Sequence, residues 1–166
     1  MGNIILVGFM GTGKTTVGKA LAKRLGYRFV DMDDIIEERE GMKISEIFEK
    51  KGEQYFRRVE SEVAADIPLR SGLVVAAGGG AVINEENVRN MKRNGIMFCL
   101  FASPERIFER TKGHTHRPLL NVGDPLGKIS ELLARRAEYY ARADHRIDTT
   151  DLSVNEVVDR IEEHLK

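Results

Sequence analysis

Gly8-Phe9-Met10-Gly11-Thr12-Gly13-Lys14-Thr15 lies between an apolar run, residues 3–7, and a segment with helical periodicity, residues 14–25. It fits the pattern G-x-x-x-x-G-K-[ST], in which glycines let the backbone curl so that successive N–H groups point at one anion. A helix that begins where the loop ends adds the positive end of its dipole. The stretch therefore predicts a strand, a phosphate-binding loop and a helix in direct succession, which is the start of an α/β fold.

The side chains of this loop divide between phosphate and metal contacts. Lys14 can reach the terminal phosphate oxygens as a point charge, and the Thr15 hydroxyl can ligate a Mg²⁺ ion that bridges them, with Thr16 as a weaker substitute. A glycine-rich turn with only a structural role is the alternative. The expected nucleotide-binding residues of the loop are Gly11, Thr12, Gly13, Lys14, Thr15 and Thr16.

Short apolar runs alternate with longer amphipathic segments along the whole chain, a pattern typical of βαβ units around a parallel sheet. Strands are expected near residues 3–7, 27–31, 72–77, 95–101 and 144–148. Helices are expected at Lys14 to Leu25, Asp34 to Glu40, Glu46 to Ile67 as one or two helices, Leu126 to Tyr140, and behind a Ser153-x-x-Glu156 capping box. The fold class predicted is α/β, with a central five-stranded parallel sheet flanked by helices.

The composition favours a single domain, residues 1–166, because a chain of 166 residues is too short for two ordinary cores. Twenty-six Lys and Arg balance twenty-six Asp and Glu, so nothing in the overall charge favours nucleic acid or an anionic membrane as a partner. The one cysteine, Cys99, lies in an apolar run and is expected to be a buried thiol. No signal peptide or membrane-spanning run is evident, and we expect a cytoplasmic monomer.

Two carboxylates, Asp31 and Asp33, follow the second expected strand. Strand periodicity would place both on one face, at the sheet edge where doubly wound folds bind ligands. Helix capping is the alternative role, but Asp34 can cap the next helix by itself. The strand before Gly78 carries no acidic residue at its end, so Asp31 is the candidate for the metal-side carboxylate.

Three further features suggest a ligand beside the nucleotide. The triplet Gly78-Gly79-Gly80 allows close approach to backbone N–H groups, with a tight turn as the alternative. Arg136 falls in the apolar stripe of Leu126, Ile129, Leu133 and Tyr140, where a guanidinium needs an anionic partner. Arg57 is either a second anion-binding group or the partner of Glu53 or Glu60 in a helical ion pair.

The segment from about 111 to 124 has little periodicity and offers no apolar face, which predicts a mobile loop. Arg117 lies within it and could swing over the terminal phosphate. Closing such a loop would keep water from taking the phosphoryl group. We therefore expect a lid over the phosphate-binding loop.

Taken together, five motifs resemble the shikimate kinase family over nearly the whole chain. They are Gly8-Phe9-Met10-Gly11-x-Gly13-Lys14, Asp31-x-Asp33, Gly52-Glu53-x-x-Phe56-Arg57-x-x-Glu60, Gly78-Gly79-Gly80-Ala81-Val82 and Arg117-Pro118-Leu119-Leu120. The resemblance implies a three-layer P-loop kinase fold with a mobile lid. It also implies that ATP phosphorylates the 3-hydroxyl of shikimate, giving shikimate 3-phosphate and ADP in aromatic amino-acid biosynthesis.

The resemblance also assigns roles to residues of this sequence. Shikimate would lie against a helical segment at about 32–61 and bind Asp33, Arg57, Gly78, Gly79, Gly80 and Arg136, with both arginines on its carboxylate. The implied catalytic residues are Lys14, Asp31, Asp33 and Arg117. Asp31 would act near Mg²⁺, through water or as a base, with Thr15 as the other metal-side ligand. Arg110 would stack on adenine, with a solvated helix-end arginine as the alternative.

Two other functions remain open on the sequence. A P-loop kinase for another hydroxy acid, such as gluconate, is the nearer alternative, although the glycine triplet and the Phe56-Arg57 motif favour shikimate. An ATP-gated regulatory module is the alternative from another class, which the neutral charge balance and the lack of a basic stripe disfavour. Turnover measured against a panel of acceptors separates these possibilities.

Overall fold

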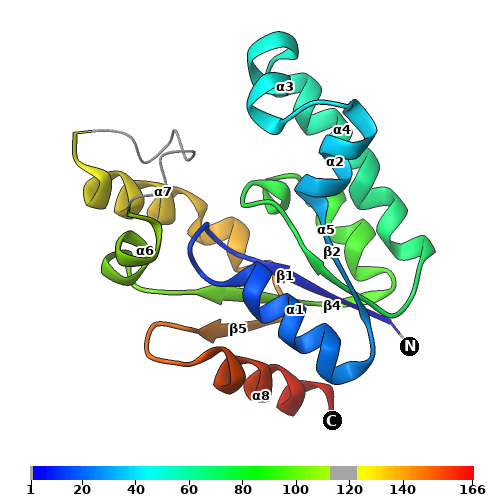
Figure 1. Ribbon diagram of the computed structural model, residues 1–166, viewed down its shortest axis with the longest axis vertical. Coiled ribbons are helices and arrows are strands. Elements are labelled where there is room, and N and C mark those ends of the chain that lie inside the picture. The colour runs from blue at the N-terminus through cyan, green and yellow to red at the C-terminus, as the bar shows by residue number, and fades with distance from the viewer. Residues whose placement is uncertain (1, 113–122) are drawn as a thin grey trace.

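A parallel sheet forms the centre of the molecule in the computed structural model, which describes residues 2–112 and 123–166 (Figure 1). Within these residues the sheet has five strands in the order β2-β3-β1-β4-β5, and every neighbouring pair is parallel. The strands are β1 (Asn3–Val7), β2 (Arg28–Asp31), β3 (Leu73–Ala76), β4 (Gly95–Phe101) and β5 (His145–Asp148). The predicted five-stranded parallel sheet is confirmed.

Helices cover both faces of this sheet. They are α1 (Lys14–Leu25), α2 (Met32–Glu40), α3 (Ile44–Lys51), α4 (Glu53–Asp66), α5 (Glu85–Lys92), α6 (Pro104–Thr111), α7 (Pro125–Tyr140) and α8 (Val154–Leu165), with short 3₁₀ turns η1 (Ile67–Leu69) and η2 (Ala81–Ile83). Helices α1 and α8 pack against each other on one face (Figure 1). Helix α3, with α2 and the beginning of α4, projects away from the sheet (Figure 1).

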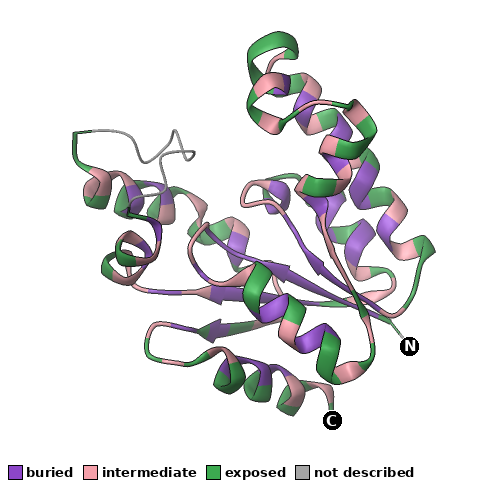
Figure 2. Cartoon of the chain, viewed as in Figure 1, coloured by how far each residue is buried: buried purple, intermediate pink, exposed green. Residues whose placement is uncertain are grey.

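The strand sequence explains the three layers, because successive side chains point to opposite faces. Ile4 and Leu6 of β1 belong to an apolar cluster with α1 and α8, whereas Ile5 and Val7 belong to a cluster with α4, α5 and α7. The three central strands β1, β3 and β4 are buried along most of their length, whereas the edge strands β2 and β5 are mostly half-buried or exposed (Figure 2). Cys99 is part of this core, and burial raises the pKa of its thiol to about 11.

Several helix boundaries differ from the expected ones. The segment expected as one or two helices is two, α3 and α4, separated at Gly52, whose φ of 88° ends the first of them. Helix α7 begins one residue earlier than expected, and the stripe assigned to it was partly wrong, because Leu126 is exposed while Leu132 is buried. Helices α5 and α6 were not predicted. The capping box at Ser153 is confirmed.

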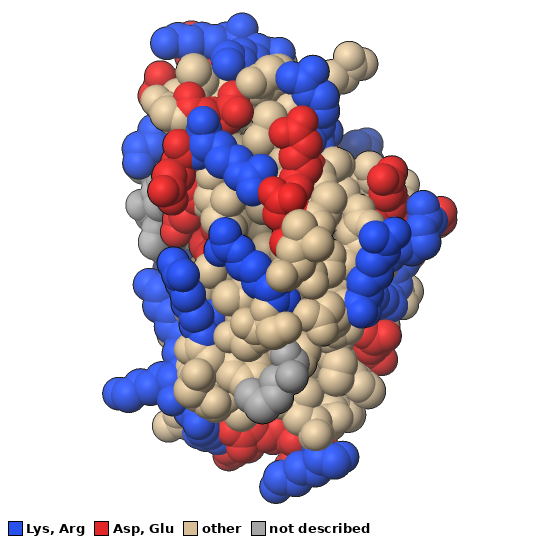
Figure 3. Space-filling view, turned by 90° about the vertical axis from the view of Figure 1, so that its right-hand side faces the viewer, with Lys and Arg blue, Asp and Glu red and all other residues tan. Residues whose placement is uncertain are grey.

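No helix of the residues that the structure describes is long and apolar enough to cross a membrane. The face turned toward the viewer in Figure 3 mixes Lys and Arg with Asp and Glu. Neighbouring charges of opposite sign also form ion pairs along the helix surfaces, for example Arg24 with Asp159 at 2.5 Å.

The side chain of Asn3 fastens the beginning of β1 to its neighbour. Its amide nitrogen donates to the carbonyls of Ile67 (3.1 Å) and Arg70 (3.0 Å), and its oxygen accepts from the Leu73 N–H (3.0 Å). Asn3 is only 2% exposed, so these hydrogen bonds have little competition from water. This one residue holds the start of β3 in register with β1.

We expect Asn3→Leu to lower the free energy of unfolding by about 2–4 kcal/mol, because buried backbone groups lose their partners while the volume changes little. Urea denaturation followed by circular dichroism measures the change. Asn94→Ala is the matched control, since Asn94 also donates to the Arg70 carbonyl (2.8 Å) but at an exposed position. A loss no larger for Asn3→Leu than for Asn94→Ala would contradict the assignment.

Candidate active site

A cavity of about 560 Å³ lies at the carboxyl edge of the sheet. The segments that follow β1, β3 and β5 and the junction of β2 with α2 all contribute to it, because the ends of parallel strands meet at the same edge. Its walls are formed by Met10, Gly11, Thr12, Gly13, Lys14, Thr15, Thr16, Val17, Asp31, Asp33, Ala76, Ala77, Gly78, Gly79, Arg110, Arg136, Thr149, Leu152, Val154 and Val157. The cavity therefore joins the predicted phosphate loop to most of the predicted substrate residues.

The phosphate loop contains three glycines with positive φ, Gly8, Gly11 and Gly13, of which the first and the last shape its two ends. Gly8 has φ 141°, and a methyl group added to it would lie 2.2 Å from the carbonyl oxygen of Leu100. Gly13 has φ 95° and is the N-cap of α1, without a side chain between the first turn and the cavity. The loop can curl against β4 and present the N-terminus of α1 because these two positions lack side chains.

Lys14 lies across its own loop. Its Nζ donates to the carbonyls of Gly8 (2.5 Å) and Phe9 (3.1 Å), so the ammonium group is held at the loop. The hydroxyl of Thr12 also bonds to the Phe9 carbonyl (2.7 Å) and Thr12 is buried, so this side chain stabilises the loop itself. Thr15 and Thr16 line the cavity at the start of α1, as a phosphate site requires.

Asp31 and Asp33 both line the cavity, but they belong to different secondary-structure elements, which the sequence did not predict. Strand β2 ends at Asp31, and Asp33 lies in the first turn of α2, so the expectation of one shared strand face was wrong. Asp31 is the N-cap of α2 and accepts from the Asp33 N–H at 2.8 Å, which is the role expected of Asp34. Asp31 therefore caps α2 and, like Asp33, lines the cavity.

The pKa values of Asp31 and Asp33 are both raised, chiefly by burial and also by neighbouring carboxylates. The pKa of Asp33 is raised to about 6, mainly by burial and then by the charges of Asp31 and Glu60, against the opposing effect of Lys14. Burial also raises the pKa of Asp31, opposed by the hydrogen bond from the Asp33 N–H. Carboxylates held this way favour a cation or a proton donor beside them.

The glycine triplet is the surface on which the predicted acid-binding residues meet. A methyl group added to Gly80 would lie 2.7 Å from Nη1 of Arg57, and one added to Gly79 would lie 3.3 Å from Nη1 of Arg136. At Gly78 the nearest side-chain atoms are carboxylate oxygens of Asp33 and Glu60, both at 3.2 Å. Close approach therefore explains why three consecutive residues without side chains occur here.

Each predicted arginine has partners on its own side of this surface. Arg57 of α4 donates to Glu60 (3.0 Å), which is 2% exposed, and pairs with the exposed Glu53 at 3.5 Å. The helical ion pair considered for Arg57 thus exists, and it orients the guanidinium toward Gly80 instead of removing it from the site. Arg136 of α7 lies over the ring of Phe9, with the guanidinium carbon 5.7 Å from the ring centre.

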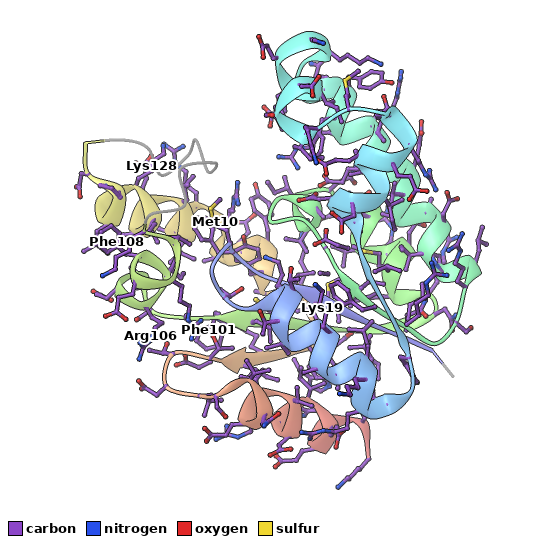
Figure 4. All side chains as sticks on the ribbon, viewed as in Figure 1. Met10, Lys19, Phe101, Arg106, Phe108 and Lys128 are labelled. Carbon is purple, nitrogen blue, oxygen red and sulfur yellow. The ribbon has the colours of Figure 1, made fainter. Side chains whose placement is uncertain are left out.

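Arg110 joins the phosphate loop to the segment after β5. Its Nη1 donates to the Gly11 carbonyl and to the Thr149 hydroxyl, both at 3.1 Å, and its Nη2 donates to the Thr149 carbonyl at 2.9 Å. Arg110 does lie in the last turn of α6, as the alternative supposed, but its guanidinium is hydrogen-bonded to the protein. Arg106, labelled beside Phe101 in Figure 4, adds a bond to the Thr150 carbonyl at 2.9 Å. Helix α6 is therefore fixed against this part of the cavity.

Sequence reasoning missed four residues that close the cavity at its far end, namely Thr149, Leu152, Val154 and Val157. The segment of Thr149 to Leu152 carries no recognised motif, and Val154 and Val157 belong to α8, the helix behind the Ser153 capping box. The apolar stripe of α8 gave no sign that part of it faces a ligand. Arg117 and residues 113–122 of the lid expected at about 111–124 lie outside the described residues.

The donor set fits a hard divalent cation. Among the described residues no group of three or more His, Cys, Asp or Glu gathers as a metal cage. A cation bound through a threonine hydroxyl, one carboxylate, water and phosphate oxygens needs no such cage, which is how proteins commonly hold Mg²⁺. Thr15 and Asp31 both line the cavity, and their oxygens are of the required kind.

We expect Asp33→Asn to stabilise the ligand-free protein above pH 6. Because the folded-state pKa of about 6 lies above the usual 3.8, ionisation of Asp33 disfavours folding as the pH rises through this range. The gain should be absent near pH 4 and reach roughly 1–3 kcal/mol at pH 8 in urea denaturation.

The exposed neighbour provides the control for this measurement: Asp34→Asn should give no gain that grows with pH. Equal stability of the Asp33→Asn variant and the parent protein at pH 8 would show that Asp33 carries no such penalty.

Comparison with known proteins agrees with the geometry. The family model described as shikimate kinase matches residues 10–166. A shikimate kinase of Thermodesulfovibrio yellowstonii is 51% identical over 161 residues, covering 97% of this chain and 93% of that protein. One of Persephonella marina is 48% identical over 165 residues, covering 97% and 99%.

Solved structures give the same result. The shikimate kinase of Acinetobacter baumannii in complex with shikimate has a TM-score of 0.92 and 39% identity, covering 99% of this chain and 93% of that one. The shikimate kinase of Aquifex aeolicus has a TM-score of 0.82 and 36% identity, covering 98% and 95%. On the phosphate loop, the glycine triplet and these matches, the chain belongs to the shikimate kinase family.

Proposed function

We infer that this protein transfers the γ-phosphoryl group of ATP to the 3-hydroxyl of shikimate, giving shikimate 3-phosphate and ADP in aromatic amino-acid biosynthesis. The observation that carries the inference is that one cavity is lined both by the phosphate loop and by residues of the proposed carboxylate-binding surface. Arg136 and Gly79 line the same cavity as Lys14 and Thr15. Membership of the shikimate kinase family supplies the identity of the acid.

The acid is recognised by charge and by fixed geometry. A guanidinium fork matches a carboxylate, and the two forks of Arg57 and Arg136 lie at adjacent glycines, Gly80 and Gly79. Asp33, beside Gly78, is placed to accept hydrogen bonds from ring hydroxyls. We propose that the helical segment 32–61 forms the wall of this acid-binding half. An uncharged polyol would offer these two guanidinium groups no carboxylate to bind.

Phosphoryl transfer depends mainly on positioning and charge stabilisation. In the proposed complex the ammonium group of Lys14 exchanges its carbonyl partners for phosphate oxygens, and backbone N–H groups of the loop hold the polyphosphate. Thr15 and Asp31 would hold Mg²⁺, Asp31 through water. Bound there, Mg²⁺ supplies positive charge to the phosphate oxygens. Arg110, Thr149 and Leu152 form the end of the cavity available to the base.

The proton of the attacking hydroxyl needs an acceptor as the new bond to phosphorus forms. Asp33 lines the cavity and burial raises its pKa to about 6, so this carboxylate is one candidate for the acceptor, with Asp31 as the other. Asp31 already accepts from the N–H of Asp33, which fixes its carboxylate near the metal side. Arg117 would complete the charge stabilisation over the γ-phosphate from the predicted lid. The protein is further proposed to act as a cytoplasmic monomer.

We expect release of ADP from ATP and Mg²⁺ to require shikimate. In a coupled assay, gluconate and a nucleoside monophosphate should give rates near the background, because neither satisfies both the arginine pair and Asp33. ATP hydrolysis without an acceptor is the control for uncoupled turnover. A rate with gluconate equal to that with shikimate would overturn the substrate assignment.

We expect Arg136→Ala to weaken shikimate binding on the order of 100-fold while ADP binding changes little, because a charge-assisted pair is lost only in the acid half. Lys14→Ala should have the opposite profile, with turnover abolished and shikimate still bound. Calorimetric titration with shikimate and with ADP measures the two affinities, and the coupled assay measures turnover.

Arg135→Ala is the matched control for the arginine variant, since its side chain is exposed and pairs with Glu131 away from the cavity. An unchanged shikimate affinity in Arg136→Ala would show that this guanidinium does not hold the carboxylate.

A further inference from the structure

Tyr140 connects helix α7 to the glycine triplet. Its hydroxyl donates to the carbonyl of Gly79 at 3.0 Å, a contact between residues 61 positions apart in the chain. Tyr140 is 6% exposed, and burial raises the pKa of its phenol, so the hydroxyl stays protonated and available as a donor near neutral pH. This polar bond lies at the edge of the proposed acid-binding surface.

The same side chain meets the guanidinium of Arg136. The two residues are one helical turn apart, four positions, and so lie on the same face of α7. A hydrogen bond with Arg136 and the charge of that residue partly offset the effect of burial on the pKa of Tyr140. Relative to the Cβ position that Gly79 lacks, Nη1 of Arg136 is at 3.3 Å and the Tyr140 hydroxyl at 4.0 Å. The Tyr140 phenol, the Arg136 guanidinium and the Gly79 peptide therefore lie in contact with one another.

The hydrogen bond from Tyr140 to the Gly79 carbonyl also fixes the orientation of the Gly80 N–H, which belongs to the same peptide unit. The described residues contain no cis peptide bond, and in a trans peptide the carbonyl of Gly79 and the N–H of Gly80 point in opposite directions. With the carbonyl directed at α7, the Gly80 N–H is directed away from it. Arg57 approaches Gly80 closely, with Nη1 and Nη2 at 2.7 and 2.8 Å from its absent Cβ position.

We propose that Tyr140 is a positioning residue for substrate binding, which through its hydroxyl sets the orientation of the Gly79–Gly80 peptide and of the Arg136 guanidinium without touching the substrate itself. This rests on the proposed function, since it takes these groups to be the acid-binding surface. The bond determines how well the surface is organised before the acid arrives. Pre-organisation of this kind strengthens binding by lowering the ordering cost.

A purely structural role, docking α7 onto the rest of the fold, makes a different prediction. Arg142, just after α7, also joins this helix to the segment after β3, because its Nη1 donates to the carbonyls of Val82 (2.7 Å) and Ile83 (3.0 Å). That connection lies beyond the glycine triplet. If docking alone mattered, loss of either connection would have the same effect on shikimate binding.

The test compares Tyr140→Phe with the parent enzyme by calorimetric titration and initial rates. We expect the Kd and KM for shikimate to rise about five- to twentyfold, as for the loss of one buried hydrogen bond and the order it imposes. The Kd for ADP should stay within about twofold. KM does not depend on the fraction of enzyme that is active, so it reports on the acid site even if part of the variant is unfolded.

Arg142→Met and Tyr139→Phe are the controls, and both should bind shikimate within about twofold of the parent protein. Unchanged shikimate affinity in Tyr140→Phe overturns the proposal, as does an equal loss of shikimate affinity in Arg142→Met. A parent protein that binds no shikimate would instead refute the proposed function, and this inference with it.

Discussion

The alignment of parallel strands around β1 is the constraint on which the site depends. Leu6 pairs with Ala76 of β3, Val7 pairs with Cys99 of β4, and Asp31 of β2 pairs with the same Ala76. The phosphate loop, the glycine triplet and Asp31 therefore begin at one level of the sheet. A register shift of one residue would also reverse which side chains face the two cores, so burial holds this alignment in place.

The electrostatics of the site are arranged for ligands with negative charge and hydroxyl groups. Asp31, Asp33 and Glu60 are carboxylates whose pKa values are raised chiefly by burial. The charges of Arg57 and Arg136 act in the opposite direction on Glu60 and lower its pKa, so both arginines lie close enough to this buried carboxylate to interact with it. Such a cluster costs stability in the folded chain, a cost common at sites that must bind charged ligands. The large apolar cores on both faces of the sheet offset it.

The glycine triplet is where separate parts of the chain meet. Helix α4 brings Arg57 and Glu60, α2 brings Asp33, and α7 brings Arg136 and Tyr140. None of these helices adjoins the triplet in sequence, yet each places a polar group within van der Waals distance of a missing Cβ. The backbone of the triplet is thus the place where these polar side chains from three helices come together.

Local patterns in the sequence were sufficient for the phosphate loop, the five strands, helix α1 and the Ser153 capping box, because each depends on residues close together in the chain. They also identified Asp33, Arg57 and Arg136 as charged residues that needed partners. Only the tertiary structure decided the strand order, the capping role of Asp31, and the places of Thr149, Leu152 and Tyr140 at the site. These depend on contacts between distant segments, such as Tyr140 with Gly79. Contacts of that kind leave no periodicity or spacing for the sequence to display.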